Sequence, residues 1–228
     1  MSRRRTGITP GGQGRFAGYD VLRQRPTWDA VTAGVVLRRL GPPQPLRFFT
    51  PAEEATATAL VDHLLGQWDE PKVPVLAMID ERLTEGSTDG WHHADMPSDE
   101  DAWRSTLSSL DADATAAHSR GFAEITREQQ AAVIQAVQDR AGDGASWHGL
   151  PASHVWSLWT RYACTAFYAH PWAWNEIGFG GPAYPRGYKN AGLGKREPWE
   201  RPERRAHDPI PEVRESTEDR RERLEAGR

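Results

Sequence analysis

A short histidine and aspartate cluster is the first candidate for chemistry in this sequence. His92, His93 and Asp95 lie within four residues, and imidazole and carboxylate groups are ligands that zinc accepts in proteins. Adjacent histidines usually point apart, and no His-x-x-x-His or Glu-x-x-His pair supports these two. We therefore interpret them as exposed loop histidines and predict no metal site.

A second group of polar side chains surrounds the end of a long predicted helix. His154 and His170 flank that helix, and Glu176 and Tyr184 follow it. In a free-standing enzyme, His170, Glu176 and Tyr184 could line a pocket and exchange protons with a substrate, and this stays an alternative. No nucleophile, base and orienting group can be assigned from these residues. We predict no catalytic residue and favour a helix-cap or interface hydrogen bond for both histidines.

The glycine-rich run at 178–181 is a candidate phosphate-binding loop. A dinucleotide site needs a strand before the glycines and a helix N-terminus after them. Here the glycines follow a predicted loop and run into Pro182. We therefore predict that this chain binds no flavin or nicotinamide cofactor.

Composition excludes several classes of function. The net charge of -4 provides no basic field for nucleic acid, and no apolar run is long enough to span a bilayer. The single cysteine, Cys164, cannot form a Cys-x-x-Cys-His haem attachment. We expect its thiol to be buried, as a small apolar side chain within a helix.

Helix signals dominate the sequence, and the helices must position the groups described above. Strand evidence is thin, so we predict an all-α fold, an irregular bundle of about five to six helices. The helix at 151–169 is apolar on two adjacent faces, which indicates a central helix or one covered by another protein. The predicted helices are 28–40, 51–65, 74–86, 98–121, 126–142 and 151–169.

A long aromatic, Gly/Pro-rich loop is predicted after the last helix. Pro171 lacks a backbone donor and restricts His170, so the helix should end there and the chain should continue extended. Each large aromatic side chain can bury roughly 150 to 250 Å². The loop must therefore fold back on its own core or dock on a partner, and we favour the partner. The predicted interface set is Trp156, Phe167, His170, Trp172, Trp174, Asn175, Phe179, Tyr184 and Tyr188.

The chain divides into three expected parts. These are an N-terminal arm at 1–47 with one peripheral helix, a helical domain at 48–190, and a charged, extended tail at 191–228. Three arginines at 3–5 suggest a twin-arginine signal, but glycines and polar residues follow them instead of an apolar region. We expect a cytoplasmic location unless a signal on a partner subunit carries the complex across the membrane.

Four blocks of this sequence occur together in a known family. They are Phe48-Phe49-Thr50-Pro51-Ala52-Glu53-Glu54, Leu60-Val61-Asp62-His63-Leu64-Leu65, Gly121-Phe122 before Gln129-Gln130, and Phe167-Tyr168-Ala169-His170-Pro171 with the later Gly178-Phe179-Gly180-Gly181-Pro182. Over about residues 48–188 the chain resembles the gluconate 2-dehydrogenase subunit 3 family. The last block is the specific part of this resemblance.

The resemblance implies an accessory subunit with no flavin and no catalytic residues of its own. Its partner would be an FAD-containing catalytic subunit of the glucose-methanol-choline type, which oxidises a sugar or an alcohol. In such complexes a cytochrome c subunit with haem c often takes the electrons. The small subunit would be needed to assemble and stabilise the flavoprotein. A helical binding module unrelated to redox chemistry is the remaining alternative.

Overall fold

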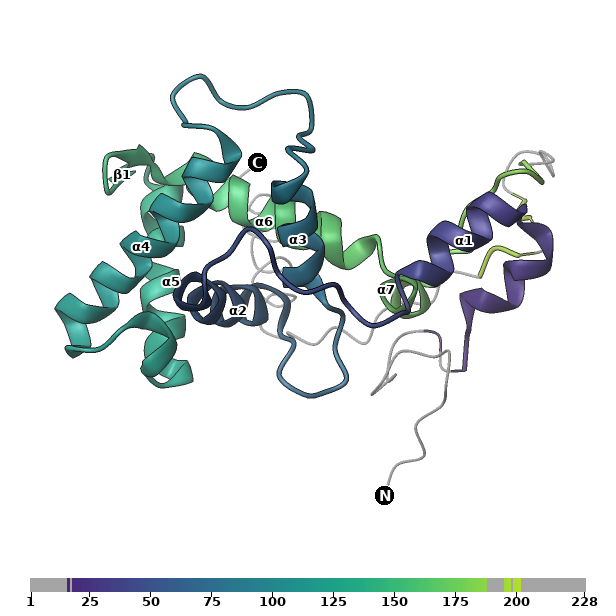
Figure 1. Cartoon of the computed structure of the whole chain (residues 1–228), viewed down its shortest axis with the longest axis horizontal. Coiled ribbons are helices and arrows are strands. Elements are labelled where there is room, and N and C mark those ends of the chain that lie inside the picture. The colour runs from purple at the N-terminus through teal and green to yellow at the C-terminus, as the bar shows by residue number, and fades with distance from the viewer. Residues whose placement is uncertain (1–15, 17, 188–194, 198, 202–228) are drawn as a thin grey trace, which may run out of the picture. The chain divides into compact units, whose positions relative to one another are not determined.

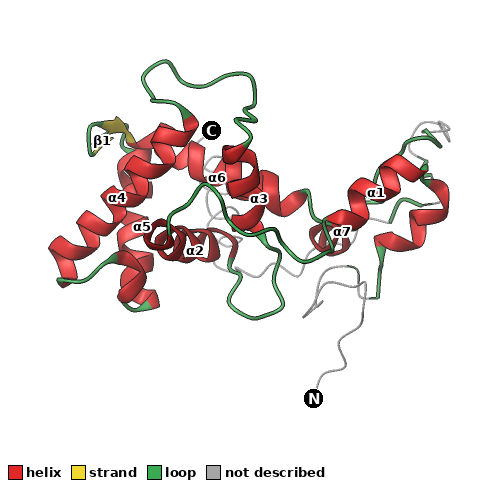
Figure 2. Cartoon of the chain, viewed as in Figure 1, coloured by secondary structure: helices red, strands yellow, loops and turns green. Residues whose placement is uncertain are grey.

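The computed structural model describes residues 16, 18–187, 195–197 and 199–201. Within these residues the chain is mostly helical and has one two-stranded hairpin, so the all-α prediction is confirmed (Figure 2). The elements, labelled in Figure 1, are η1 (Val21–Thr27), α1 (Ala30–Arg38), α2 (Pro51–Leu65), α3 (Val75–Thr84), α4 (Asp99–His118), η2 (Phe122–Glu124), α5 (Arg127–Gly142), β1 (Ser146–Trp147), β2 (Leu150–Pro151), α6 (Ala152–Tyr168) and α7 (Pro171–Ile177).

The chain forms two compact units. We call residues Ala33–Ala173 the helical body, and the described residues up to Thr32 together with those from Trp174 onward the terminal unit. The expected boundaries were 47/48 and 190/191. These boundaries stay a prediction, and long-range contacts described below join the N-terminal segment to residues that follow α6.

Side-chain caps begin three helices of the body where the sequence predicts them. Thr50 accepts a hydrogen bond from the N–H of Glu53, whose carboxylate accepts one from the N–H of Thr50 at 2.8 Å. Thr126 and Gln129 form the same reciprocal capping box at the start of α5. Ser98 caps α4. These side chains satisfy N–H groups that have no partner within the helix, which is why the three starts are predictable.

Helix α6 is the centre of the body, as its two apolar faces predict. It packs against α2, α3, α4 and α5. Because four helices surround it, the wide apolar surface is used within the chain itself. Its most buried face carries Val155, Leu158, Trp159, Tyr162 and Ala166.

Buried polar side chains explain two of the sequence blocks. The carboxylate of Asp80 is buried and accepts hydrogen bonds from the N–H groups of Arg47, Phe48 and Phe49 at 2.8, 2.9 and 3.0 Å. Gln130 donates to the carbonyl oxygen of Phe122 at 2.9 Å. Asp80 thus fixes the entry to α2, and Gln130 ties α5 to η2, because buried backbone groups require partners.

Several predicted boundaries in the body are wrong, and two of them are instructive. Helix α4 ends at His118, where the left-handed residue Ser119, with φ 57°, is the C-cap, and does not continue to Gly121. Pro151 was expected to begin a helix, but it pairs with Ser146 in the β1–β2 hairpin. Strands of two residues each have no alternating run of apolar side chains, so the usual strand signal is absent.

The segment after α6 is also helical at first, contrary to the predicted extended loop. Helix α6 ends at Tyr168, and α7 begins at Pro171. Proline is favoured at the first helical position, because the N–H it lacks would have no partner there. The Nδ1 atom of His170 accepts a hydrogen bond from the N–H of Trp172 at 3.2 Å, so this side chain caps the start of α7. With η1, η2 and α7, the described residues contain more helices than expected.

No helix in the described part of the chain combines the length and the apolarity that a membrane span requires. The long apolar stripes of α4 and α6 face the core of the body instead.

Candidate partner-binding site

The terminal unit is assembled from segments far apart in the sequence. Residues 19–28 lie beside residues 175–182, and side chains on both sides satisfy backbone groups of the other. Three hydrogen bonds join the segments: Val21 N–H to Asn175 Oδ1 at 2.8 Å, Tyr19 O–H to the Phe179 carbonyl at 3.1 Å, and Trp28 Nε1–H to the Pro182 carbonyl at 3.1 Å.

Glycines allow the aromatic rings of the N-terminal segment to approach the 178–181 backbone. Gly178 has φ +70°, and a Cβ atom there would lie 2.5 Å from Cε2 of Phe16. Gly181 has φ +74°, and its Cβ would lie 2.9 Å from Cζ2 of Trp28. Only glycine tolerates both the left-handed backbone and these contacts. The glycine-rich run is therefore a packing surface for rings of the same chain.

Arg186 adds a second layer to the terminal unit. Its guanidinium group stacks 4.1 Å from the ring centre of Trp199. It also donates to Thr27 Oγ1 at 2.8 Å and to the carbonyl of Gly180 at 3.2 Å. These contacts fix residues on both sides of the exposed Tyr184.

The predicted interface residues divide into buried and exposed groups. Three are buried within the chain: His170 is 1% exposed, Asn175 4% and Trp174 6%. Two are well exposed: Phe179 at 43% and Tyr184 at 66%. The exposed pair remains available to a partner in this conformation, whereas the buried three serve the packing of the chain itself.

The other members of the predicted set lie in the body or outside the described residues. Trp156, Phe167 and Trp172 are partly buried and pack against the body core. Tyr188 lies outside the described residues. The partner role of the whole set stays a prediction.

Two exposed aliphatic residues of the terminal unit were missed by sequence reasoning. Val31 is 75% exposed and Ile177 is 47% exposed. Single aliphatic residues at helix ends create no periodic pattern, so no signal in the sequence marks them.

The expected burial of Cys164 is wrong. Its side chain is exposed, because it lies on the side of α6 that faces away from the core.

The surroundings of His170 argue against acid–base catalysis by this residue. Its Nε2–H donates to the carbonyl of Arg39 at 2.7 Å, and its Nδ1 accepts from Trp172, so both ring nitrogens are occupied. Burial lowers the pKa of His170 to about 4, and the imidazole is neutral at neutral pH. His170 belongs to the body, whereas Glu176 and Tyr184 belong to the terminal unit. The enzyme alternative gains no support from these observations.

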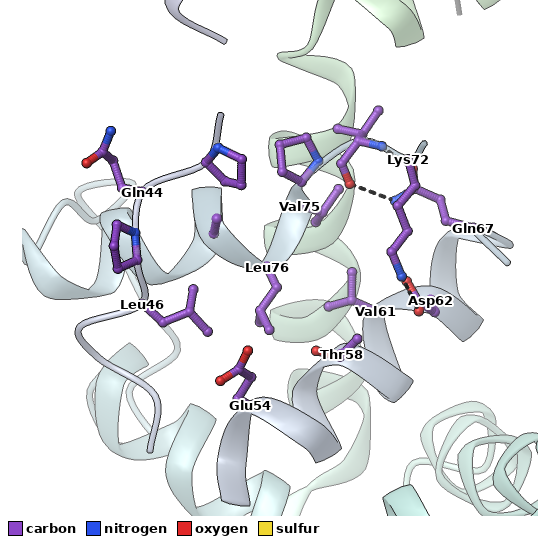
Figure 3. A pocket seen from close by; sticks show the side chains of 15 residues that line it. Gln44, Leu46, Glu54, Thr58, Val61, Asp62, Gln67, Lys72, Val75 and Leu76 are labelled. Carbon is purple, nitrogen blue, oxygen red and sulfur yellow. Dashed lines mark hydrogen bonds and ion pairs between the residues drawn. The ribbon is translucent and has the colours of Figure 1, made fainter. Parts of the chain in front are cut away.

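A groove on the body is a concave site among the described residues (Figure 3). It has a volume of about 430 Å³ and lies between residues 43–46, α2 and α3. Leu46, Val61 and Leu76 form an apolar floor, and Lys72 pairs with Asp62 at 2.6 Å on its rim (Figure 3). Glu54 and Thr58 of α2 also line the groove, so its lining combines apolar, hydroxyl and charged side chains (Figure 3).

The histidine cluster has one member that sequence reasoning did not connect to it. His93 and Asp95 lie close to His154, the histidine in the first turn of α6. His92 is exposed and is not part of this group. A separation of about 60 residues produces no ligand motif, so the sequence alone could not indicate the third member.

A comparison with protein families identifies the chain. The family model described as Gluconate 2-dehydrogenase subunit 3 matches residues 51–181, which is more than half of the sequence. The chain belongs to this family. The resemblance proposed from the sequence blocks is thereby confirmed. No curated protein and no solved structure matches the chain.

As a member of the gluconate 2-dehydrogenase subunit 3 family, the chain is an accessory subunit of a dehydrogenase complex, which implies partner subunits. The match begins at Pro51, where α2 begins, and ends at Gly181, within the run that contacts Trp28. Tyr184 and the N-terminal segment that covers these glycines lie outside the matched residues. The glycines at 178 and 181 therefore lie within the matched region, whereas the rings of Phe16 and Trp28 that pack on them lie outside it.

Proposed function

We propose that this chain is the non-catalytic small subunit of an FAD-dependent sugar or alcohol dehydrogenase and is needed to assemble its catalytic flavoprotein. The observation that carries the proposal is family membership over residues 51–181. FAD would be bound by a catalytic partner of the glucose-methanol-choline type. A third subunit with haem c would accept the electrons.

The exposed rings of the terminal unit support a partner-binding role. Aromatic residues are enriched among side chains that dominate binding energy. The Phe179 ring packs edge-to-face on the buried Trp174, with ring centres 5.5 Å apart, and its carbonyl is held by Tyr19. A ring on such a fixed support loses little conformational entropy when it binds.

The half-buried aromatics of the body supply a second candidate surface. Trp156, Phe167 and Trp172 each pack one side on the core and retain some exposure. The edge of Phe167 also contacts Tyr168, which is 50% exposed. We include these residues in the proposed interface because a partner could cover their remaining surface without unfolding the chain.

The test is co-expression of the full chain with its candidate flavoprotein partner, followed by affinity capture, mass spectrometry and flavin absorbance. We expect a yellow complex and a colourless isolated chain. A purified chain that is yellow and oxidises sugars without a partner would refute the proposal. Recovery of the chain without any flavoprotein under co-expression would also contradict it.

Three tryptophan and phenylalanine variants separate binding from folding. Phe179→Ala should weaken capture about thirtyfold, or about 2 kcal/mol, and leave the melting temperature of the isolated chain nearly unchanged. Trp174→Ala should instead lower stability, because this side chain is buried. Trp68→Ala is the matched control: Trp68 is 39% exposed, similar to Phe179, but lies outside the proposed set. Equal loss of capture with Trp68→Ala would contradict the proposed surface.

We also propose a cytoplasmic location for the complex unless a partner subunit carries an export signal. The support is the polar, glycine-rich sequence at 11–15 that follows the arginines at 3–5. Fractionation of cells that express the chain with its partner would test this, and periplasmic recovery that depends on the chain's own N-terminal residues would refute it.

A further inference from the structure

The connection between α3 and α4 brings two metal-ligand side chains to the start of α6. His93 and Asp95 lie in this connection, and His154 lies in the first turn of α6. One ligand atom from each residue lies within 4.8 Å of the other two. All three residues belong to the helical body.

The two imidazole rings are stacked and share an acidic neighbour. The rings of His93 and His154 are nearly parallel, with an angle of 3° and centres 3.6 Å apart. Asp95 Oδ1 lies 2.9 Å from Nδ1 of His154. A carboxylate beside two imidazoles favours a cation at this point, because it supplies negative charge and oxygen ligands.

Several contacts hold the connection against the body. Asp89 forms ion pairs with Arg82 of α3 and with Arg161 of α6. Trp91 packs edge-to-face on His93, with ring centres 5.3 Å apart, and Arg161 lies 5.3 Å above the Trp91 ring. These contacts restrict the position of His93, so His93 does not have the mobility of an isolated surface side chain.

We propose that His93, Asp95 and His154 bind one zinc ion, which clips the α3–α4 connection to α6. Two imidazoles and one carboxylate match the ligand types of zinc, whereas magnesium and calcium prefer oxygen ligands throughout. Zinc–ligand bonds of about 2.0 to 2.2 Å in a tetrahedron require ligand atoms about 3.3 Å apart. The three atoms, which lie within 4.8 Å of one another, must therefore move closer by up to about 1.5 Å, and the stacked rings must turn toward the ion.

The ion would tie the α3–α4 connection to the first turn of α6, with water as its fourth ligand. Asp95 is exposed and His93 is partly exposed, so water can reach the fourth coordination position. Zinc binding would stabilise the folded chain in proportion to its affinity, since the three ligands meet only in the folded state.

The direct test is calorimetric titration of the full chain, carried on a histidine-free tag, with zinc chloride. We expect one zinc ion per chain and a melting temperature that rises with zinc. His154→Ala and His93→Ala should each weaken binding by at least about tenfold and abolish the thermal shift. Asp95→Asn, which keeps the side-chain shape, should weaken binding by a similar factor.

His92→Ala is the matched control, because His92 neighbours His93 but lies outside the cluster. Its zinc affinity should stay within about twofold of the unchanged chain. Circular dichroism of each zinc-free variant shows whether it is folded. If a histidine variant does not fold, the zinc affinity of Asp95→Asn tests the proposal in its place. Absence of zinc binding, or a loss with His92→Ala equal to that with His154→Ala, would overturn the proposal.

Discussion

The helical body and the terminal unit reach stability by different means. In the body, long amphipathic helices direct apolar stripes onto α6, and one continuous core results. In the terminal unit, individual hydrogen bonds link residues 154 to 160 positions apart, and glycines admit aromatic rings. Many apolar side chains contribute to the stability of the body, whereas the terminal unit depends on a few specific contacts. Substitutions should therefore act globally in the first and locally in the second.

The largest effect is expected from Trp159→Ala in the body. Trp159 is fully buried, packs edge-to-face on Trp147 at 5.5 Å, and donates to Thr106 Oγ1 at 3.0 Å. Its removal leaves a large cavity and should cost about 3 to 5 kcal/mol of unfolding free energy. Chemical denaturation followed by circular dichroism measures this. The half-buried Trp156→Ala is the control and should cost less; equal losses would contradict the central position of the buried face.

The second largest effect is a dependence of the unfolding free energy on pH, which originates at His170. The pKa of His170 is about 4 in the folded chain, against an ordinary value of 6.5. Between these pH values the unfolded chain binds a proton at His170 and the folded chain does not, so the unfolding free energy falls as the pH falls. At about 1.4 kcal/mol per pH unit, the loss from pH 6.5 to 4 amounts to about 3 kcal/mol.

The His170→Gln variant isolates this contribution. Glutamine retains a donor and an acceptor but does not titrate in this range. Denaturation curves of both proteins at a series of pH values should diverge between pH 6.5 and 4, with the flatter dependence in the variant. If the unfolding free energies of the two proteins depend on pH in the same way, the pKa of His170 is not lowered in the folded chain.

The difference between the two units also explains what could be predicted from the sequence. The capping boxes at Thr50 and Thr126, and the apolar stripe of α6, are local patterns, so the body helices were predicted nearly to their ends. Asn175 and Gly181 acquire their roles only through Val21 and Trp28, which lie more than 150 residues away. No local pattern encodes such contacts, and the aromatic segment was therefore predicted as an extended loop.

The candidate site was predictable to a similar degree. Aromatic composition indicated Phe179 and Tyr184, because large rings outside a predicted core are unusual. It could not indicate that Trp174 is buried by residues of the same chain. His154 escaped notice for the same reason, since its neighbours His93 and Asp95 come from a distant connection.

A smaller and more local effect follows Gly181→Ala in the terminal unit. A Cβ atom at Gly181 would lie 2.9 Å from both Trp28 Cζ2 and Val21 Cγ2, and the φ of +74° is unfavourable for alanine. Strain and overpacking together should cost about 2 kcal/mol. We expect faster amide exchange in residues 18–32 and 174–187, with exchange in α6 unchanged, because the body core does not include these contacts.

Gly187→Ala separates backbone strain from ring packing. Gly187 also has a positive φ, +64°, but a Cβ there would meet no atom within 4 Å. This variant should cost about 1 kcal/mol from the backbone alone and leave exchange at Val21 and Trp28 nearly unchanged. If both variants accelerate exchange around Trp28 equally, the backbone conformation and not the ring contact holds the segment. If Gly181→Ala also accelerates amide exchange in α6, the two units do not unfold separately. That result would contradict the expectation that substitutions in the terminal unit act locally.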